Sequence, residues 1–404
     1  MTTLSDATTA YFDHAATTPM VPEAAATMAE HLTRLGNPSS LHASGRAARR
    51  TVEESRETIA QLLGARPADV VFTSGGTEAD NIAVKGLFWA RLAADPRCCR
   101  ILAPDTEHHA VLDPLVWLAG AEGAQVELMG VDEVGRLRLS QLRAQLAREP
   151  EMVALVTCMW ANNEVGTIAP LPEVVALAHA HGIPVHSDAV QALGHVPVDF
   201  AASGLDAMTV TAHKIGGPVG VGALLVRREL DVVPLLHGGG QERDIRSGTM
   251  NAPAVAAFAT AVELAVARQA AQAERLEALR AELIERVREI VPTVVVNGDP
   301  AAGAEHRLPG IVHLTFPGCE GDSLLMLLDA HGIECSTGSA CTAGVPQASH
   351  VLLAMGQDEA DARGSLRLSL GHTSSPADLE ALLRVLPSAY ERARAAGLTG
   401  ARSR

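Results

Sequence analysis

The stretch "DVVFTSGGTEADNIAVKGLFWARLA", residues 69–93, carries the pattern that decides the fold. Its apolar, β-branched start favours a buried strand, the Ser-Gly-Gly-Thr run at 74–77 is typical of a turn, and the acidic, then apolar, remainder favours a helix. Free backbone amides at the start of such a helix can bind a phosphate. A plain strand-to-helix turn explains this stretch equally well, so the stretch alone leaves both interpretations open.

The same alternation continues through the first half of the chain. Apolar strands are predicted at 100–104, 152–160, 183–189 and 206–212, and helices at 108–121 and 171–182. Strands that alternate with helices predict a mainly parallel, wound sheet of the α/β class. Ligands of such sheets bind at the carboxyl ends of the strands, so that edge is where functional residues are expected.

The pattern changes in the second half. Residues 254–290 are rich in Ala, Glu, Arg and Leu and predict one or two helices that bridge two domains. Short strands at 293–298, 310–316 and 364–371, with helices at 322–332 and 376–396, then predict a smaller α+β domain.

Composition excludes several classes of function. The chain has 404 residues, 47% of them hydrophobic, which suits a large globular core. A net charge of -15 without a basic cluster argues against a nucleic-acid-binding surface. The N-terminal residues resemble no signal peptide, and no apolar run approaches the roughly 20 residues of a membrane span. A cytoplasmic protein with no membrane partner is expected.

Cysteine and histidine spacing gives no metal motif. The six cysteines form no CxxC pair and no zinc spacing, and the 16 histidines include no HExxH. We therefore expect no resident metal ion. Most of the cysteines are expected to be small buried side chains.

Two polar residues end apolar strands of the predicted sheet. Lys214 follows the strand at 206–212, and Asp188 closes the strand at 183–189. A partly desolvated lysine can form a Schiff base with a carbonyl cofactor, and a carboxylate can pair with the pyridine nitrogen of pyridoxal 5′-phosphate (PLP). Taken singly, Lys214 could be a surface charge and Asp188 a helix cap. Together with the glycine turn at 74–77 they match the shape of this cofactor.

A series of motifs strengthens this interpretation. They are "YFDHAATTP" (11–19), "FTSGGTEADN" (72–81), "TEHHAVL" (106–112), "ANNEVGT" (161–167), "SDAVQALG" (187–194), "TAHKIGGPVGVGAL" (211–224), "HGGGQERDIRSGT" (237–249), "STGSACTAG" (336–344) and "GSLRLSLGHT" (364–373). In order and spacing they resemble the cysteine desulfurases of the NifS/IscS type, which are class V, fold-type I PLP enzymes. HGGG also occurs in esterases, but this chain has no GxSxG nucleophile motif.

The resemblance implies a role for each matching residue. Lys214 would carry the cofactor as a Schiff base, Asp188 would pair with its ring nitrogen, and His108, rather than His109, would stack on the ring and move protons. The other cofactor-binding residues that it implies are Asn163 and Gln191 at the phenolic oxygen, and Gly76, Thr77, Thr211 and His213 at the phosphate. Thr249 would reach the phosphate of the other subunit in a homodimer, although a glycine loop without a ligand would explain its segment too. Thr211-Ala212-His213 departs mildly from the usual Ser-Gly-His.

Two further residues are expected to handle the substrate. Strict alternation in "GSLRLSLG" turns Arg367 away from the small-domain core, and by resemblance it binds the substrate α-carboxylate together with Asn163. A surface strand arginine is the alternative. Cys341 lies among small residues in a loop at about 336–347, which suits an exposed nucleophilic thiol, whereas Cys335 is expected to be structural. A transient iron–sulfur cluster at Cys341 stays possible by resemblance.

The resemblance thus implies a PLP-dependent cysteine desulfurase. It would convert L-cysteine to L-alanine, leave a persulfide on Cys341, and supply a sulfur acceptor or an iron–sulfur scaffold protein. The alternatives are a selenocysteine lyase, another class V aminotransferase, or a protein that serves mainly as a sulfur-relay scaffold. We expect a large PLP-binding domain at 19–262 and a small domain formed by 1–18 and 263–404.

Overall fold

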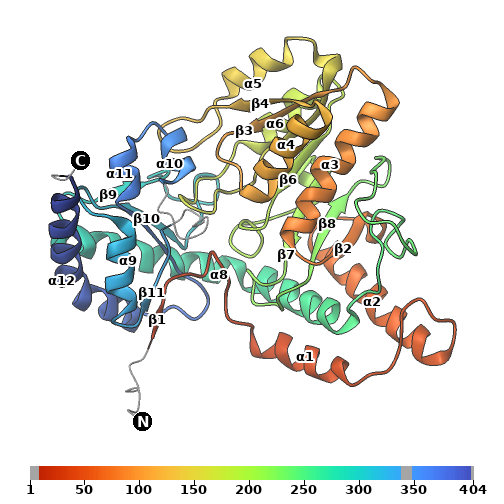
Figure 1. Cartoon of the computed structure of the whole chain (residues 1–404). Coiled ribbons are helices and arrows are strands. Elements are labelled where there is room, and N and C mark those ends of the chain that lie inside the picture. Colours follow the sequence, from red (N-terminus) through yellow and green to blue (C-terminus); the bar gives the residue numbers. More distant parts are fainter. Residues whose placement is uncertain (1–8, 338–347, 402–404) are drawn as a thin grey trace.

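The structure is a computed structural model that describes residues 9–337 and 348–401. Of the residues predicted to act in the site, Cys341 lies outside these ranges. Figure 1 shows the chain arranged as a larger and a smaller part, with the long helix α8 running from one to the other.

A seven-stranded sheet forms the centre of the larger part. Its strand order is β2-β8-β7-β6-β5-β3-β4, and β8 runs antiparallel to both β2 and β7, whereas the other neighbours pair in parallel. The strands are β2 (Val70–Thr73), β3 (Arg100–Pro104), β4 (Gln125–Met129), β5 (Val153–Thr157), β6 (Val185–Asp188), β7 (Ala207–Thr211) and β8 (Gly222–Val226). This confirms the predicted α/β class with a mainly parallel sheet.

The strands of this sheet bury their side chains in two separate apolar cores, one on each face. Val70 and Phe72 of β2 pack in one core, and Val71 packs in the other. A sheet buried on both faces needs helices on both sides. The helices of this part are α1 (Pro22–Leu32), α2 (Ala43–Leu62), α3 (Gly76–Ala94), α4 (His109–Glu122), α5 (Leu139–Leu146), α6 (Leu171–His179) and α7 (Phe200–Ser203).

Residues 254–290, predicted as one or two helices, lie within a single helix, α8 (Ala252–Ile290). Phe258 and Val262 near its start belong to the core under the large sheet, and Leu276 and Leu283 belong to the core of the smaller part. In the described part of the chain, α8 is the helix whose length and composition would allow it to cross a membrane. Core helices meet the same criterion, and both halves of α8 pack against protein.

The smaller part contains two short sheets. β9 (Val295–Asn297), β10 (Ile311–Thr315) and β12 (Ser365–Ser369) are antiparallel, and β1 (Ala10–Tyr11) pairs in parallel with β11 (Ile333–Glu334). Its helices are α9 (Gly321–Asp329), α10 (His350–Ala354), α11 (Glu359–Arg363) and α12 (Pro376–Ala401). Phe12 lies in the core of this part.

Candidate active site

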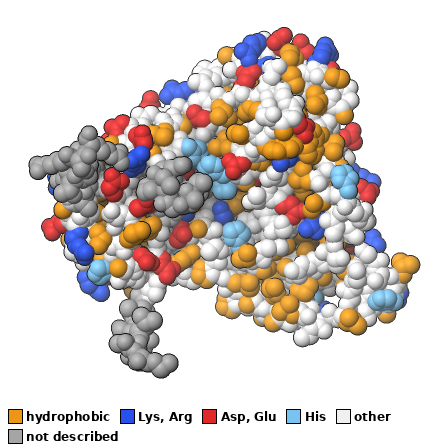
Figure 2. All heavy atoms as spheres, viewed as in Figure 1, with side chains coloured by type: hydrophobic (Ala, Val, Ile, Leu, Met, Phe, Trp, Pro, Cys, Tyr) orange, Lys and Arg blue, Asp and Glu red, His pale blue; other side chains and the backbone are white. Residues whose placement is uncertain are grey.

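A cavity of about 370 Å³ lies at the carboxyl ends of the large sheet, against the smaller part. On the face shown in Figure 2, histidine, acidic and basic side chains gather around the hollow between the two parts. The predicted residues that line this cavity are Gly76, Thr77, His108, Asn163, Asp188, Gln191, Thr211, His213, Lys214 and Arg367. The start of α3, the carboxyl ends of β6 and β7, and Arg367 in the middle of β12 thus converge on one space.

Lys214 and Asp188 both line this cavity. Burial lowers the pKa of Lys214 to about 8, although the nearby Asp188 acts in the opposite direction. Asp188 is the last residue of β6, and its Oδ1 accepts a hydrogen bond of 2.8 Å from the backbone N–H of Val190. An amine with this pKa is partly neutral near pH 8, so it is available as a nucleophile or a base.

His108 and His109 take different directions at the start of α4. His108 is the N-cap residue, and its Nδ1 accepts a hydrogen bond of 3.0 Å from the backbone N–H of Ala110. Burial lowers the pKa of His108, with Asp188 opposing this shift. Nδ1 of the exposed His109 lies 3.1 Å from Oδ1 of Asp113, and His109 is not among the residues that line the cavity. Only the first of the two adjacent histidines therefore faces the cavity.

The turn before α3 forms the other end of the cavity. Gly75, the N-cap residue, has a φ of 151°, which glycine tolerates far better than other residues. A Cβ on Gly222 of β8 would lie 2.9 Å from the Cα of Gly75, so the strand packs tightly behind the turn. The start of α3 therefore presents its backbone amides to the cavity, which is an arrangement that suits an anion.

Arg367 reaches the cavity from β12. Its Nη1 donates to the backbone oxygen of Asn163 at 3.0 Å, and its Nη2 donates to Oδ1 of Asp13 at 2.8 Å. Its Nε is buried without a hydrogen-bond partner among the described residues. Since a buried unpaired donor is costly, this N–H is suited to donate a hydrogen bond to a ligand carboxylate.

Comparisons with known proteins agree with this geometry. The model of the class-V aminotransferase family matches residues 10–382. The chain is 57% identical to an IscS-like cysteine desulfurase from Mycobacterium tuberculosis, over 97% of this chain and 99% of that protein. The chain belongs to the class-V aminotransferase family. A solved NifS-like protein superposes with a TM-score of 0.86 at 33% identity, covering 94% of this chain and 98% of that one. SspA in complex with cysteine gives 0.77 at 31% identity, covering 90% and 99%.

Class-V aminotransferases of the cysteine desulfurase group use PLP, and the cavity suits this cofactor. Its phosphate needs donors, which the start of α3 offers, and its aldehyde needs an amine, which Lys214 offers. Its ring nitrogen needs a carboxylate, which Asp188 offers. Asp80 also lines the cavity, and its buried Oδ1 lies 3.5 Å from Nε2 of His186. The set of donors and acceptors thus fits PLP.

Two predicted residues are not part of this lining. Thr249 is exposed and lies outside the cavity lining, and Cys341 lies outside the described ranges. Cys335 packs against the core of the smaller part. Burial, and then the neighbouring Asp13, raise the pKa of its thiol to about 12. Cys335 therefore has little thiolate character at neutral pH.

Asp80 and Asp13 were missed by the sequence interpretation. Asp80 lies four residues after Gly76 on α3, so helical spacing alone could have placed it on the same face as the glycine turn. Asp13 offered no such signal. Its contact with Arg367 depends on how the N-terminal segment packs against β12. Asp13 of that segment forms a parallel β-bridge with Ser369 of β12.

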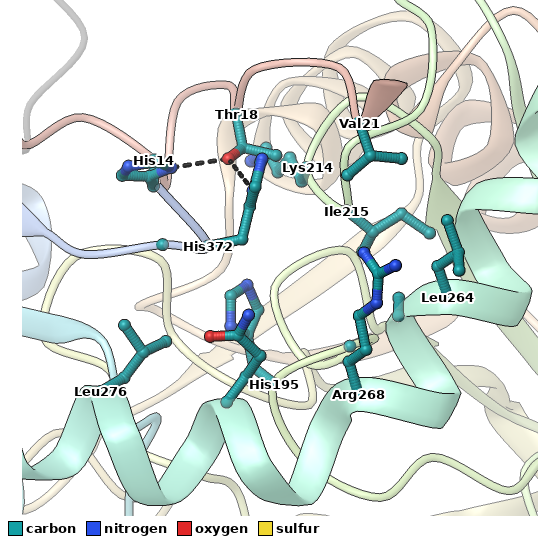
Figure 3. Close-up of a pocket in the computed structure, with 14 residues that line it drawn as sticks. His14, Thr18, Val21, His195, Lys214, Ile215, Leu264, Arg268, Leu276 and His372 are labelled. Carbon is teal, nitrogen blue, oxygen red and sulfur yellow. Dashed lines mark hydrogen bonds between the residues drawn. The ribbon is translucent and has the colours of Figure 1, made fainter. Parts of the chain in front are cut away.

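A second, smaller space of about 70 Å³ is also lined by Lys214 (Figure 3). Nδ1 of His14 lies 2.6 Å from Oγ1 of Thr18, which lies 3.3 Å from Nδ1 of His372. Burial lowers the pKa of His14 to about 3 and also lowers that of His372. These histidines are therefore neutral near pH 7, so they place no full positive charge beside the lysine.

Proposed function

We propose that this chain is a PLP-dependent cysteine desulfurase that converts L-cysteine to L-alanine and transfers the sulfur to Cys341. The observation that carries the proposal is the convergence of Lys214, Asp188, His108 and Arg367 on one cavity. Its similarity to an IscS-like cysteine desulfurase, and to SspA, which was solved with cysteine, supports the choice of substrate.

Each side of the cavity has its own part in binding. Lys214 would hold the cofactor covalently, and Asp188 would keep a negative charge at its ring nitrogen. His108 would lie against the ring, with Asn163 and Gln191 near its phenolic oxygen. Gly76, Thr77, Thr211 and His213 would surround the phosphate. When bound, PLP would withdraw electrons from the α-carbon of the substrate, next to the amino nitrogen.

Arg367 would bind the substrate carboxylate. Asp13 and the backbone oxygen of Asn163 hold its guanidinium in place through Nη2 and Nη1. Lys214, whose amine is partly neutral, and His108 would then move the α-proton, because both line the same cavity. Their lowered pKa values favour the neutral, proton-accepting forms.

Cys341 would take the sulfur. Its thiolate attacks the substrate Sγ, the Cβ–Sγ bond breaks, and a persulfide forms on Cys341. The electron pair of that bond stays with Cβ, which takes up a proton and becomes the methyl group of alanine. The persulfide sulfur then passes to an acceptor, either a sulfur carrier or an iron–sulfur scaffold protein, in the cytoplasm.

A second copy of the chain would complete the site. Thr249 is exposed and could reach the phosphate end of a partner's cavity in a homodimer. Leu32, Leu35 and Leu41 have exposed fractions of 61%, 85% and 87%, and Figure 2 shows hydrophobic side chains over α1 and the segment that follows it. Such side chains suit burial against protein. We place the domain boundary near Val262 in α8, giving domains at 19–262 and at 1–18 with 263–404.

Turnover of L-cysteine in the presence of a reductant tests this function. Alanine and sulfide would be measured for the wild type, Cys341→Ser and the matched control Cys335→Ser. We expect Cys341→Ser to lose sulfide release while the protein still binds PLP, and Cys335→Ser to behave like the wild type. If Cys341→Ser released sulfide as fast as the wild type, the persulfide route would be wrong.

A further inference from the structure

We propose that Arg246 is a positioning residue that neutralises Glu78 and so keeps the start of α3 able to hold the phosphate of the cofactor. The inference rests on the proposed function, because it takes Gly76 and Thr77 as the phosphate end of the cavity. Arg246 itself is absent from the residues that line the cavity. It would act through Glu78.

Glu78 is the third residue of α3, directly after Gly76 and Thr77. Its Oε2 accepts the backbone N–H of Ser74 at 2.6 Å, and its Oε1 accepts Nε–H of Arg246 at 2.9 Å. The side chain of Glu78 is only 15% exposed, and that of Arg246 is 19% exposed. The carboxylate is thus fixed in the first helical turn, next to the cavity, with Arg246 as its ion-pair partner.

A carboxylate at this position creates an electrostatic conflict. The amino end of a helix favours negative charge, and both Glu78 and a phosphate would compete for it. Burial tends to raise the pKa of Glu78, but hydrogen bonds from Ser74 and Arg246 outweigh it and lower the pKa. Glu78 is therefore charged at neutral pH. Without Arg246 it would repel an incoming phosphate, and because Glu78 is largely buried, solvent and salt would screen this repulsion only weakly.

The segment around Arg246 is held at a second point. Glu242 accepts hydrogen bonds from both terminal nitrogens of the buried Arg56, at 2.8 and 2.6 Å, and from the backbone N–H of Phe72 at 2.8 Å. Between Glu242 and Arg246, Arg243 and Asp244 have positive φ values of 54° and 58°. Such residues persist only where their surroundings hold them. Two ion pairs flank this turn and fix the position of Arg246.

Binding of two ligands to the full-length apoprotein separates this role from a general structural one. PLP carries the phosphate, whereas pyridoxal lacks it, and the Kd of each would be measured by fluorescence titration. We expect Arg246→Gln to weaken PLP binding about tenfold and to leave pyridoxal binding unchanged. Arg246→Lys, which keeps the charge, should stay within about threefold of the wild type for PLP.

The double variant Glu78→Gln with Arg246→Gln is the decisive comparison. Since it removes both charges, its PLP affinity should return to within about threefold of the wild type. Arg243→Gln is the matched control in the same segment and should change neither Kd. Equal losses for PLP and pyridoxal in Arg246→Gln, or no recovery in the double variant, would overturn the inference.

Thr77→Val distinguishes failure of the inference from failure of the proposed site. If Thr77→Val weakens PLP binding but Arg246→Gln does not, only the role of Arg246 is wrong. If Thr77→Val leaves the Kd of PLP unchanged, the phosphate end has been misplaced and the inference fails with it.

Discussion

Two carboxyl groups on α3, only two residues apart, have pKa values that are shifted in opposite directions, although burial acts to raise both. The pKa of Asp80 is raised well above its ordinary value, because burial dominates and Asp188 adds a like charge. The pKa of Glu78 is lowered, because hydrogen bonds from Ser74 and Arg246 outweigh its burial. The difference teaches that partners, rather than depth alone, decide the charge at each end of this cavity.

The two ends therefore suit different tasks. Around Asp188 and Lys214, desolvation raises the pKa of Asp80 and lowers that of Lys214, so it favours the neutral form of each group, which suits proton transfer. At the start of α3, backbone amides and a neutralised carboxylate suit the binding of an anion. The following predictions test this contrast, from the largest expected effect to the smallest.

Lys214→Ala tests whether the chemical step depends on the end of the cavity that holds Lys214 and Asp188. We expect alanine formation from L-cysteine to fall by at least about 10³-fold, because this variant loses both a covalent anchor and a proton carrier. Alanine would be measured by chromatography with PLP in excess. Thr77→Val, at the other end, should recover most of its activity under the same excess of PLP. If the two variants lost activity equally, the division of tasks would be wrong.

Glu164→Gln tests whether burial dominates elsewhere near the cavity. Burial raises the pKa of Glu164 to about 7, against the hydrogen bond from Ser349, which tends to lower it. A raised pKa means that the folded protein binds the proton more tightly than the unfolded chain. The protonated Glu164 therefore contributes its full share to the free energy of unfolding below about pH 4.5. This contribution, about 3 kcal/mol, is lost as the pH rises through about 7.

Glu164→Gln should remove this part of the pH dependence. The measurement is the free energy of unfolding in urea at several pH values from 4.5 to 8. An unchanged slope between the wild type and the variant would show that Glu164 does not titrate in this range.

Asp80→Asn tests the neutral state of Asp80 directly. Because burial raises the pKa of Asp80 and so favours its neutral form, the amide should change kcat by no more than about threefold. Asp188→Asn should be far more damaging, because it removes a charge that the cofactor needs. Steady-state rates at pH 7 check both variants. Equal losses would mean that Asp80 carries charge as well.

His109→Gln should have the smallest effect, within about twofold of the wild type. Its side chain is exposed and pairs with Asp113 outside the cavity lining. His108→Gln should lower kcat by about 10²-fold, because it removes a partly buried imidazole that lines the cavity. Steady-state kinetics of this adjacent pair test whether position relative to the cavity, rather than residue type, decides the effect.

Much of the fold could be read from local patterns. Strand and helix alternation predicted the sheet and most of its strands, but β4 and β8 were not predicted. β4 lies at the edge of the sheet and is only partly buried, and β8 follows a glycine-rich run that is typical of a loop. Residues 254–290 left the number of helices open, because a continuous apolar pattern does not show where one core ends and the next begins.

The sequence by itself determined which residues stand at strand ends and helix starts. Parallel strands place their carboxyl ends at one edge, so Gly76, Asp188 and Lys214 were predictable neighbours. Only the tertiary structure decided the contacts of Arg367 with Asp13, and of Arg246 with Glu78, since each joins segments far apart in the chain. It also decided the charges, because a pKa depends on burial and partners that packing creates and that no local pattern encodes.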